Sequence, residues 1–516
     1  MDNTTNAGGS HGFDRGPRTQ GFPAQPPTGP PGSAPRPDLG FAPPAPPPRR
    51  RRRGPAIVVG VLVAVIAIAA GFVVGWVVND DSDGADGLSV PLAAQNGTAA
   101  GDAGDSLAGA GNPAAGGGGP FDLRRGAVFV QTNDPTANEV IAFSRSEDGR
   151  VHEVGRYKTG GVGSGSFEDS AHGIVLGTTA GETSPQHNLD SAQLLYVANA
   201  GSDSISVFRV AADGLQLVSN VPSGGTKPVS LTVNHGLLYA LNSGELDDRF
   251  VLRFPDQFLD NCTHGDQPSV SGFRIDVEGR LTPIPSSTRP LSGGGRSGCA
   301  QVSFTPDGSQ LVVSERVATL PTQPAENGAI DTFAVNPDGT LGAKSVQNTS
   351  GAGPFGFAFT KDGTVLFSEQ NHTDKGKGTA SSYTMLGNGT LKAISKAVPN
   401  SGTDTCWIVP TNDGKLAFTS NALGGGSLSS YRVEDTGALT LLHPQATDKG
   451  PKDGTLDIAL SHDSRWLYQL NSHFGLLQVF QVNADGTLKF LEEHKAFDVV
   501  LPENGGQLPP FGIAAY

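Results

Sequence analysis

A unit of four short strands recurs seven times between Gly126 and Tyr516. In one copy, a first strand at Pro354–Phe359 is followed by a tight turn at Lys361–Gly363 and a second strand at Val365–Glu369. After the third strand comes a second tight turn at Gly387–Gly389, and a fourth strand begins at Thr390–Leu391. A repeat of four strands is the sequence form of a propeller blade. We therefore expect residues 126–516 to form an all-β fold, a seven-bladed β-propeller.

Two positions keep the seven units in register. The second strand ends on a polar residue in every copy: Thr132, Asn199, Asn242, Glu315, Glu369, Asn421 and Asn471. The third strand is followed by a pair that ends in glycine: Asp148-Gly149, Asp213-Gly214, Glu278-Gly279, Asp338-Gly339, Asn388-Gly389, Thr436-Gly437 and Asp485-Gly486. Asp-Gly and Asn-Gly supply the positive φ that tight hairpins need. This shared register favours blades over the alternative, a large β-sandwich with unrelated hairpins.

The domain begins and ends in the middle of a repeat unit. It opens on a second strand, Ala127–Thr132, and finishes on a first strand, Phe511–Tyr516. We expect the C-terminal strand to pair with that second strand and to close the first blade. Such a closure buries edges that would otherwise stay unpaired.

The chain before the propeller divides by composition into three parts. Residues 1–54 are rich in Pro and Gly and end in the basic run Arg49–Arg53, so we predict a disordered tail. Residues 55–78 include the uncharged stretch Ala56–Val78, which is long enough to cross a ~30 Å hydrocarbon layer as one helix. Residues 79–125 are mostly Gly, Ala, Asp and Ser and predict a flexible linker.

Charge predicts the orientation of this transmembrane helix. The arginine run precedes it and acidic residues such as Asp80 follow it, which places the N-terminus in the cytoplasm and the propeller outside a cell membrane crossed once. A cleaved signal peptide is the competing interpretation. Of the 36 Lys and Arg, 8 precede Pro55, against 3 of the 50 Asp and Glu. The propeller is therefore acidic, which speaks against a nucleic-acid partner.

The chain has only three cysteines, Cys262, Cys299 and Cys406. In an oxidising compartment a disulfide between Cys262 and Cys299 is one possibility, and three unpaired thiols are the other. Their spacing does not fit a structural zinc site, and we expect no metal and no cofactor.

The long insertions follow the ends of second strands, and this suggests a site on that face of the propeller. Glu315 and Glu369 interrupt the series of Thr and Asn there in two adjacent blades. Two carboxylates at a channel mouth would raise each other's pKa, which suits acid–base catalysis. Side chains at this position also have a simpler use, which is to cap strand ends by hydrogen bonds.

Six further residues complete the predicted site. His372 and His473 follow second strands, and histidine transfers protons near neutral pH, although each also fits an ordinary loop. Arg296 and Arg316 are candidates to bind a substrate carboxylate or to neutralise the glutamates. Asp457 lies on a first strand that lines the channel, and Trp407 offers an apolar wall or packing between blades.

The blade motifs resemble those of lactonase-type seven-bladed propellers, a family that includes 6-phosphogluconolactonases and carboxymuconate cycloisomerases. The segments that carry the resemblance are Tyr196–Phe208, Ser303–Gly308 and Phe480–Leu488. The resemblance implies activity from His, Glu and Arg at the channel mouth without an obligatory metal. Many members carry a His-x-His run before the strand that corresponds to Leu194–Asn199. This chain has a single His187 there, and an earlier strand carries His172-Gly173.

Two functions are therefore expected. In the first, a membrane-anchored, extracytoplasmic propeller hydrolyses a lactone or cyclises a small organic acid. In the second, it is a binding module or scaffold for a protein partner in the cell envelope. Acid and base groups that converge in a closed pocket would favour the first, and a shallow apolar surface built by loops would favour the second.

Overall fold

The chain divides into two units, Met1–Ala103 and Gly104–Tyr516. The computed structural model describes parts of the second unit only: residues 126–165, 170–178, 193–211, 213–244, 266–318, 327–498 and 512–516. The predicted tail, transmembrane helix and linker lie outside these residues. Within the described ranges, no helix has the length and apolar character needed to span a bilayer.

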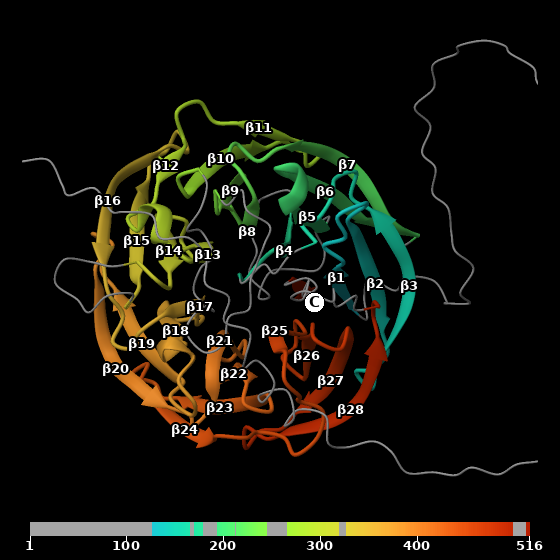
Figure 1. Cartoon of the computed structure of the whole chain (residues 1–516), viewed down its shortest axis with the longest axis vertical. Helices are drawn as coiled ribbons and strands as arrows, with labels where there is room; N and C mark the ends of the chain where they lie inside the picture. Colours follow the sequence, from blue (N-terminus) through green and yellow to red (C-terminus); the bar gives the residue numbers. More distant parts are fainter. Residues whose placement is uncertain are drawn as a thin grey trace, which may run out of the picture. The chain divides into compact units, whose positions relative to one another are not determined.

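Seven antiparallel sheets surround a central channel, so the predicted fold is confirmed (Figure 1). The first strand of each blade is innermost: β4 (Ile174–Thr178), β8 (Pro228–Asn234), β13 (Cys299–Phe304), β17 (Pro354–Phe359), β21 (Thr403–Pro410), β25 (Thr455–Leu460) and β29 (Ile513–Ala515). The second strands follow: β1 (Ala127–Gln131), β5 (Gln193–Asn199), β9 (Leu237–Asn242), β14 (Gln310–Glu315), β18 (Thr364–Glu369), β22 (Leu416–Leu423) and β26 (Trp466–Asn471).

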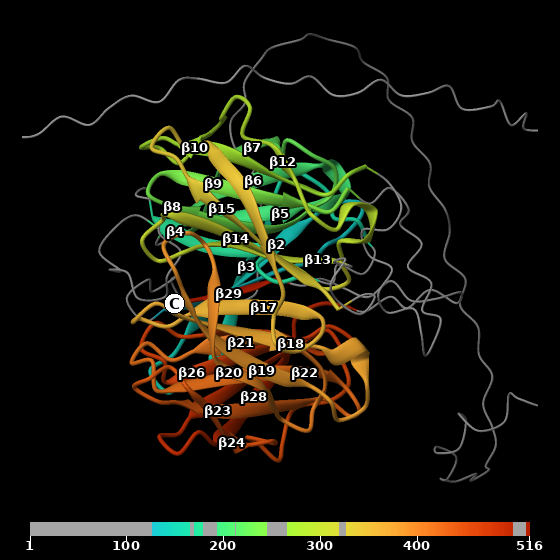
Figure 2. The ribbon, with the colours of Figure 1, turned by 90° about the vertical axis from the view of Figure 1, so that its left-hand side faces the viewer.

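The outer strands complete the blades, which stack around the ring when seen from the side (Figure 2). The third strands are β2 (Glu139–Arg145), β6 (Ser204–Ala211), β10 (Ser269–Ile275), β15 (Ala329–Val335), β19 (Thr379–Met385), β23 (Ser427–Val433) and β27 (Leu476–Val482). The fourth are β3 (Val151–Lys158), β7 (Gly214–Pro222), β11 (Leu281–Pro283) with β12 (Arg289–Pro290), β16 (Leu341–Gln347), β20 (Leu391–Pro399), β24 (Leu439–His443) and β28 (Leu488–Lys495). Short 3₁₀ helices are η1 (Ala200–Ser202), η2 (Gly294–Arg296) and η3 (Asn371–Thr373).

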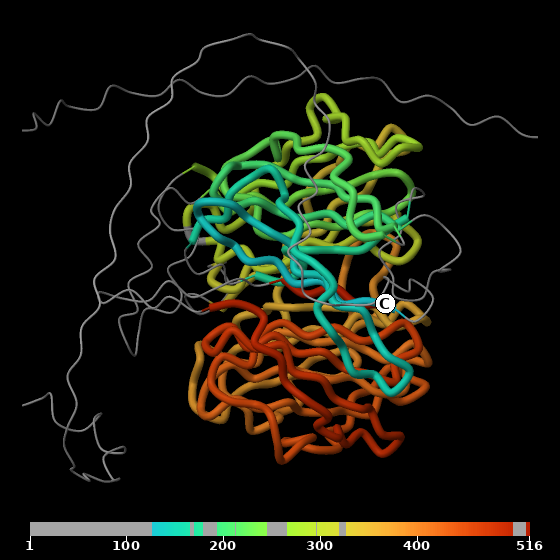
Figure 3. The backbone as a smooth tube through the Cα atoms, turned by 90° about the vertical axis from the view of Figure 1, so that its right-hand side faces the viewer, coloured from blue at the N-terminus to red at the C-terminus, as the bar shows by residue number. Residues whose placement is uncertain are grey.

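The ring closes as the sequence predicts. Strand β29 pairs antiparallel with β1, with Ile513 opposite Val130 and Ala515 opposite Val128. Figure 3 shows the red end of the chain beside its blue-green start. The first blade is therefore built from both ends of the domain, in the order β29-β1-β2-β3.

The segment between Gly160 and Asp190 contains a strand, β4. Strand β4 pairs with β5 along its full length and is the innermost strand of the second blade. It has only five residues and lies between segments rich in Gly, Ser and Thr. Such a short run gives little periodic signal in the sequence.

Neighbouring blades pack through aromatic residues of the second strands. The Tyr239 hydroxyl donates a hydrogen bond to the Gly339 carbonyl of the next blade, at 2.6 Å between oxygens. Across the closure, Tyr468 bonds the Gly149 carbonyl in the same way at 3.3 Å. A Cβ on Gly149, whose φ is +87°, would lie 2.3 Å from the ring of Trp466. The glycine of the repeated turn thus permits both the turn and the close approach of the neighbouring blade.

Candidate functional site

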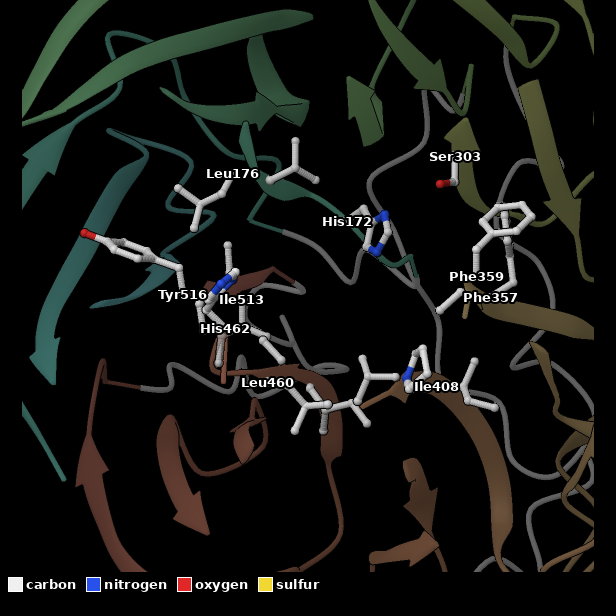
Figure 4. Close-up of a pocket in the computed structure, with 18 of the residues that line it drawn as sticks. His172, Leu176, Ser303, Phe357, Phe359, Ile408, Leu460, His462, Ile513 and Tyr516 are labelled. Carbon is white, nitrogen blue, oxygen red and sulfur yellow. The ribbon is translucent and has the colours of Figure 1, made fainter. Parts of the chain in front are cut away.

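A cavity of about 270 Å³ occupies the centre of the ring. Residues of β4, β13, β17, β21, β25 and β29 line most of it, and Asn234 adds a contact from β8. Figure 4 shows side chains from these strands converging on the cavity. The cavity is thus a product of the whole ring, because every blade contributes its innermost strand.

The mouth of the cavity lies at the tight turns between first and second strands. Pro306 and Lys361 line it at these turns and are exposed, whereas Asp457, near the start of β25, is buried. First strands run from the face of the long insertions towards the face of the tight turns. The described cavity therefore opens on the face opposite to the one for which the sequence predicted a site.

The segment Ser170–Gly173 closes the deep end. The Ala171 amide donates to the Ala300 carbonyl at 2.9 Å, which attaches the segment to β13. The His172 carbonyl accepts from the Leu231 amide of β8 at 2.9 Å. His172 itself has a φ of +65°, a left-handed conformation that few residues other than glycine adopt. These bonds hold the backbone in place and turn the imidazole towards the channel.

His172 is the first of two titratable groups at the deep end. Its imidazole lines the cavity and points into it (Figure 4). Burial lowers its pKa to about 4, because the surroundings disfavour the charged form. No described residue forms a hydrogen bond with the ring. At neutral pH His172 is therefore a neutral base that faces the cavity.

Asp457 is the second titratable group. Its Oδ2 accepts a hydrogen bond from the Ile513 amide of β29 at 3.1 Å, and its Oδ1 accepts from the Ile458 amide at 2.9 Å. Burial raises its pKa to about 8, against these two hydrogen bonds, which lower it. The carboxyl is therefore mainly protonated at pH 7. Its place at the channel is the one that the sequence indicated, and its role in substrate binding stays a prediction.

Glu369 lies in a closed hydrogen-bond network at the end of β18. Its Oε1 accepts from the Gly351 amide at 2.8 Å and from the Ser381 hydroxyl at 2.7 Å, and Oε2 accepts from the Thr379 hydroxyl at 2.6 Å. Asn421 lies at the equivalent position of the next blade. It donates hydrogen bonds to the hydroxyls of Ser427 and Ser429, which correspond to Thr379 and Ser381. Burial raises the pKa of Glu369. The Glu369 side chain thus links the third strand of its blade, β19, to Gly351 in the segment that precedes the first strand, β17.

Glu315 occupies the same position in the preceding blade. It accepts from the Gly293 amide at 2.9 Å and from the amide and hydroxyl of Ser292. Its pKa rises to about 7, first through burial and then through the charge of Asp331. The expectation that Glu315 and Glu369 raise each other's pKa is therefore wrong. Asp331, on the adjacent β15, is the partner carboxylate, and neither glutamate lines the cavity.

Four other predicted residues also lie away from the cavity: His372, His473, Trp407 and Arg316. His372 is half-buried in η3, and His473 packs against Gly454, where burial lowers its pKa. Trp407 is buried between blades, with its ring centroid 4.8 Å from that of Phe355, so the packing alternative describes its position. Arg316 is buried beside Gly298. The side chain of Arg296 is outside the described part. The catalytic and binding roles given to these residues stay predictions.

The cysteine and metal expectations have separate outcomes. Cys262 lies outside the described residues, so its pairing with Cys299 is untested. Cys299 and Cys406 are buried, with Sγ 3.3 Å from the Ser297 hydroxyl and 3.4 Å from the Gln370 amide nitrogen, respectively. Across the described ranges, no three His, Cys, Asp or Glu side chains form a cluster that could hold a metal ion.

The sequence interpretation selected neither of the two histidines that line the described cavity, His172 and His462. The signal was present, because His172-Gly173 immediately precedes a first strand in the position of a channel residue. His172 was not selected because the phase of the repeat, which marks the start of each first strand as a channel position, was not applied to this strand.

Residues 267–400 and 372–503 match the family model described as lactonase, 7-bladed β-propeller. Over these residues the chain is similar to the lactonase-type seven-bladed β-propellers. A putative 6-phosphogluconolactonase of Bacteroides fragilis is 18% identical, with a TM-score of 0.52, over 76% of this chain and 98% of that one. The periplasmic gluconolactonase of Pseudomonas aeruginosa is 16% identical, with a TM-score of 0.50 over 76% and 98% of the two chains. These likenesses concern the fold of the lactonase-type propeller. No curated protein sequence matches the chain.

Proposed function

We propose that this lactonase-type propeller hydrolyses a lactone in its central cavity. The observation that carries the proposal is the pair of groups at the deep end, a neutral histidine and a protonated carboxyl, which face one enclosed space. A small cavity with two perturbed titratable groups is what acid–base catalysis on a small molecule requires. The family match and the names of the structural neighbours support the same chemistry.

The mechanism uses each group in the form it has at neutral pH. Protonated Asp457 donates a hydrogen bond to the lactone carbonyl oxygen and stabilises the negative charge that develops there. His172 accepts a proton from water as the water oxygen bonds to the carbonyl carbon. The bond from that carbon to the ring oxygen then breaks, and the ring oxygen receives the proton from His172. The product is a hydroxy acid.

The activity should depend on pH in the shape of a bell. Below about pH 4 His172 is protonated and cannot act as a base, and above about pH 8 Asp457 has lost the proton that it donates. We expect kcat/KM for a lactone to fall on both sides of this range. His172→Asn should lower kcat/KM at least 100-fold between about pH 4 and pH 8, and the difference from the wild type should shrink at lower pH, where His172 is protonated. Asp457→Asn keeps a donor that does not ionise, and it should remove the alkaline limb.

The control for these variants is His235→Asn, which changes an exposed histidine on the same face of the propeller outside the cavity. It should leave the profile unchanged. Full activity of His172→Asn in a folded protein would refute the assignment of the site. Absence of turnover of any lactone, with a ligand still bound in the cavity, would instead indicate a binding protein.

We also propose that the propeller acts outside the cell, attached by one membrane helix. The support is the arginine run Arg49–Arg53, the apolar stretch Ala56–Val78 and the acidic residues that follow. A protein partner in the cell envelope remains a proposal of the same kind, and it draws on the long insertions alone.

A further inference from the structure

An apolar belt separates the deep end of the cavity from its mouth. Five labelled side chains in Figure 4 form it: Leu176, Phe357, Phe359, Ile408 and Leu460. They come from β4, β17, β21 and β25, so the belt covers part of the channel wall. Leu176 and Phe359 keep part of their surface exposed although they lie on innermost strands. A ligand that reaches His172 from the mouth must pass this belt.

Charge is scarce along the same route. Of the described residues that line the cavity, Lys361 is the only lysine or arginine, and it lies exposed at the mouth. Phosphate sites in proteins depend on several Arg, Lys or helix N-terminal amides. A phosphate that passed the belt would lose its water without gaining such partners, which is costly. The hydroxyls of a sugar lactone lose less than a phosphate, because polar side chains such as Ser303 and His462 also line the cavity.

We propose that the substrate is a lactone with an apolar substituent, such as an alkyl chain, and that phosphorylated sugar lactones are poor substrates. The inference rests on the proposed lactone hydrolysis. The lactone ring lies at the deep end, where His172 and Asp457 face the cavity. The substituent lies along the apolar belt and extends towards the mouth.

The first test measures kcat/KM of the full-length protein for a series of δ-lactones with alkyl chains of increasing length. Burial of one methylene contributes about 0.8 kcal/mol, so each added carbon should raise kcat/KM about three- to fourfold until the chain outgrows the belt. Glucono-δ-lactone and its 6-phosphate are measured alongside, with acid release as the readout. Both should be turned over at least 100-fold less efficiently than the best alkyl lactone.

A variant locates the effect in the belt. Leu176→Gln puts an amide of similar size at a partly exposed position. It should lower kcat/KM for the long-chain lactones about tenfold and reduce the preference for them over the sugar lactone. Leu217→Gln changes an exposed leucine on β7, 48% exposed and outside the cavity, and serves as the matched control. Both variants are checked for folding by circular dichroism.

The outcomes separate this inference from the proposed function. If sugar lactones are preferred and the His172→Asn variant does not turn them over, the apolar substrate is refuted and hydrolysis in the cavity stands. If neither class is turned over, the proposed function itself fails. A rate that does not change with chain length would also overturn the inference.

Discussion

At the scale of the residue, burial shifts the pKa values of chemically different groups in opposite directions in this molecule. It lowers the pKa of His172 to about 4 and raises that of Asp457 to about 8. Because both shifts favour the neutral form, the two side chains can face one apolar cavity without an ion pair. The buried Glu369 is stabilised differently, because its carboxyl group accepts hydrogen bonds from one amide and two hydroxyls.

Glu369 provides a prediction about stability. Its pKa is raised, chiefly by burial, so the folded protein holds a proton that the unfolded chain loses above about pH 4.3. This contribution to stability is complete below that pH and is lost as the pH rises through the folded-state pKa. Glu369→Gln can keep the same partners without a charge, with its amide donating to Thr379. We expect its melting temperature to exceed that of the wild type by at least about 1 °C at pH 8, with no gain at pH 4.

Calorimetry over this pH range makes the comparison. Glu278→Gln removes the same charge from an exposed turn and should show no such trend. A Glu369→Gln variant that is less stable than the wild type at pH 8 would mean that the carboxylate is needed in its charged form. Loss of lactone turnover in that folded variant would favour the catalytic role that the sequence suggested.

At the scale of the element, the last strand has two structural tasks. It pairs with β1 to close the ring, and it lies between β4 and β25 at the channel. The Tyr516 amide donates to the Ala127 carbonyl at 3.1 Å, whereas the Ile513 amide faces Asp457 on the opposite side. Successive amides of an antiparallel strand point to opposite sides. The Ala514 amide therefore points to β1, and the Ala515 amide points away from it.

Proline substitutions test the closure. Ala514→Pro removes a hydrogen bond of the closing ladder and should reduce the free energy of unfolding by about 1–3 kcal/mol. Ala515→Pro changes the neighbouring residue, whose amide does not take part in the ladder, and should cost much less. Urea denaturation of the two variants measures the difference. Equal losses would show that the ladder does not hold the ring closed.

At the scale of the whole molecule, acidic and basic residues are unevenly distributed. The segment before Pro55 is basic, and the rest of the chain contains 47 of the 50 acidic residues. Such asymmetry around an apolar stretch of membrane-spanning length predicts one orientation in a bilayer.

Protease protection tests the orientation. In intact cells that express the full-length chain with a tag at each end, added protease should remove the C-terminal tag and spare the N-terminal one. Replacement of Arg49–Arg53 by glutamine should weaken this asymmetry, because the arginines set the topology. Protection of both tags would place the propeller inside, and release of the propeller into the medium would favour a cleaved leader.

The sequence by itself determined the blades and their closure. Tight turns such as Asp338-Gly339 and short apolar strands are local features, and a repeat presents them seven times in one register. The polar ends of the second strands were equally visible. The role of these residues could not be seen in the sequence. Glu315 and Glu369 look like functional carboxylates until their hydroxyl and amide partners are known.

Only the tertiary structure decided which groups meet. His172 and Asp457 lie on the second and seventh blades, far apart in the chain, and the closure places β29 between the strands β4 and β25. Their pKa shifts come from desolvation, which depends on everything packed around them and on no local pattern. The same holds for the cavity and its mouth, since an enclosed space in a propeller exists only after all innermost strands surround one axis.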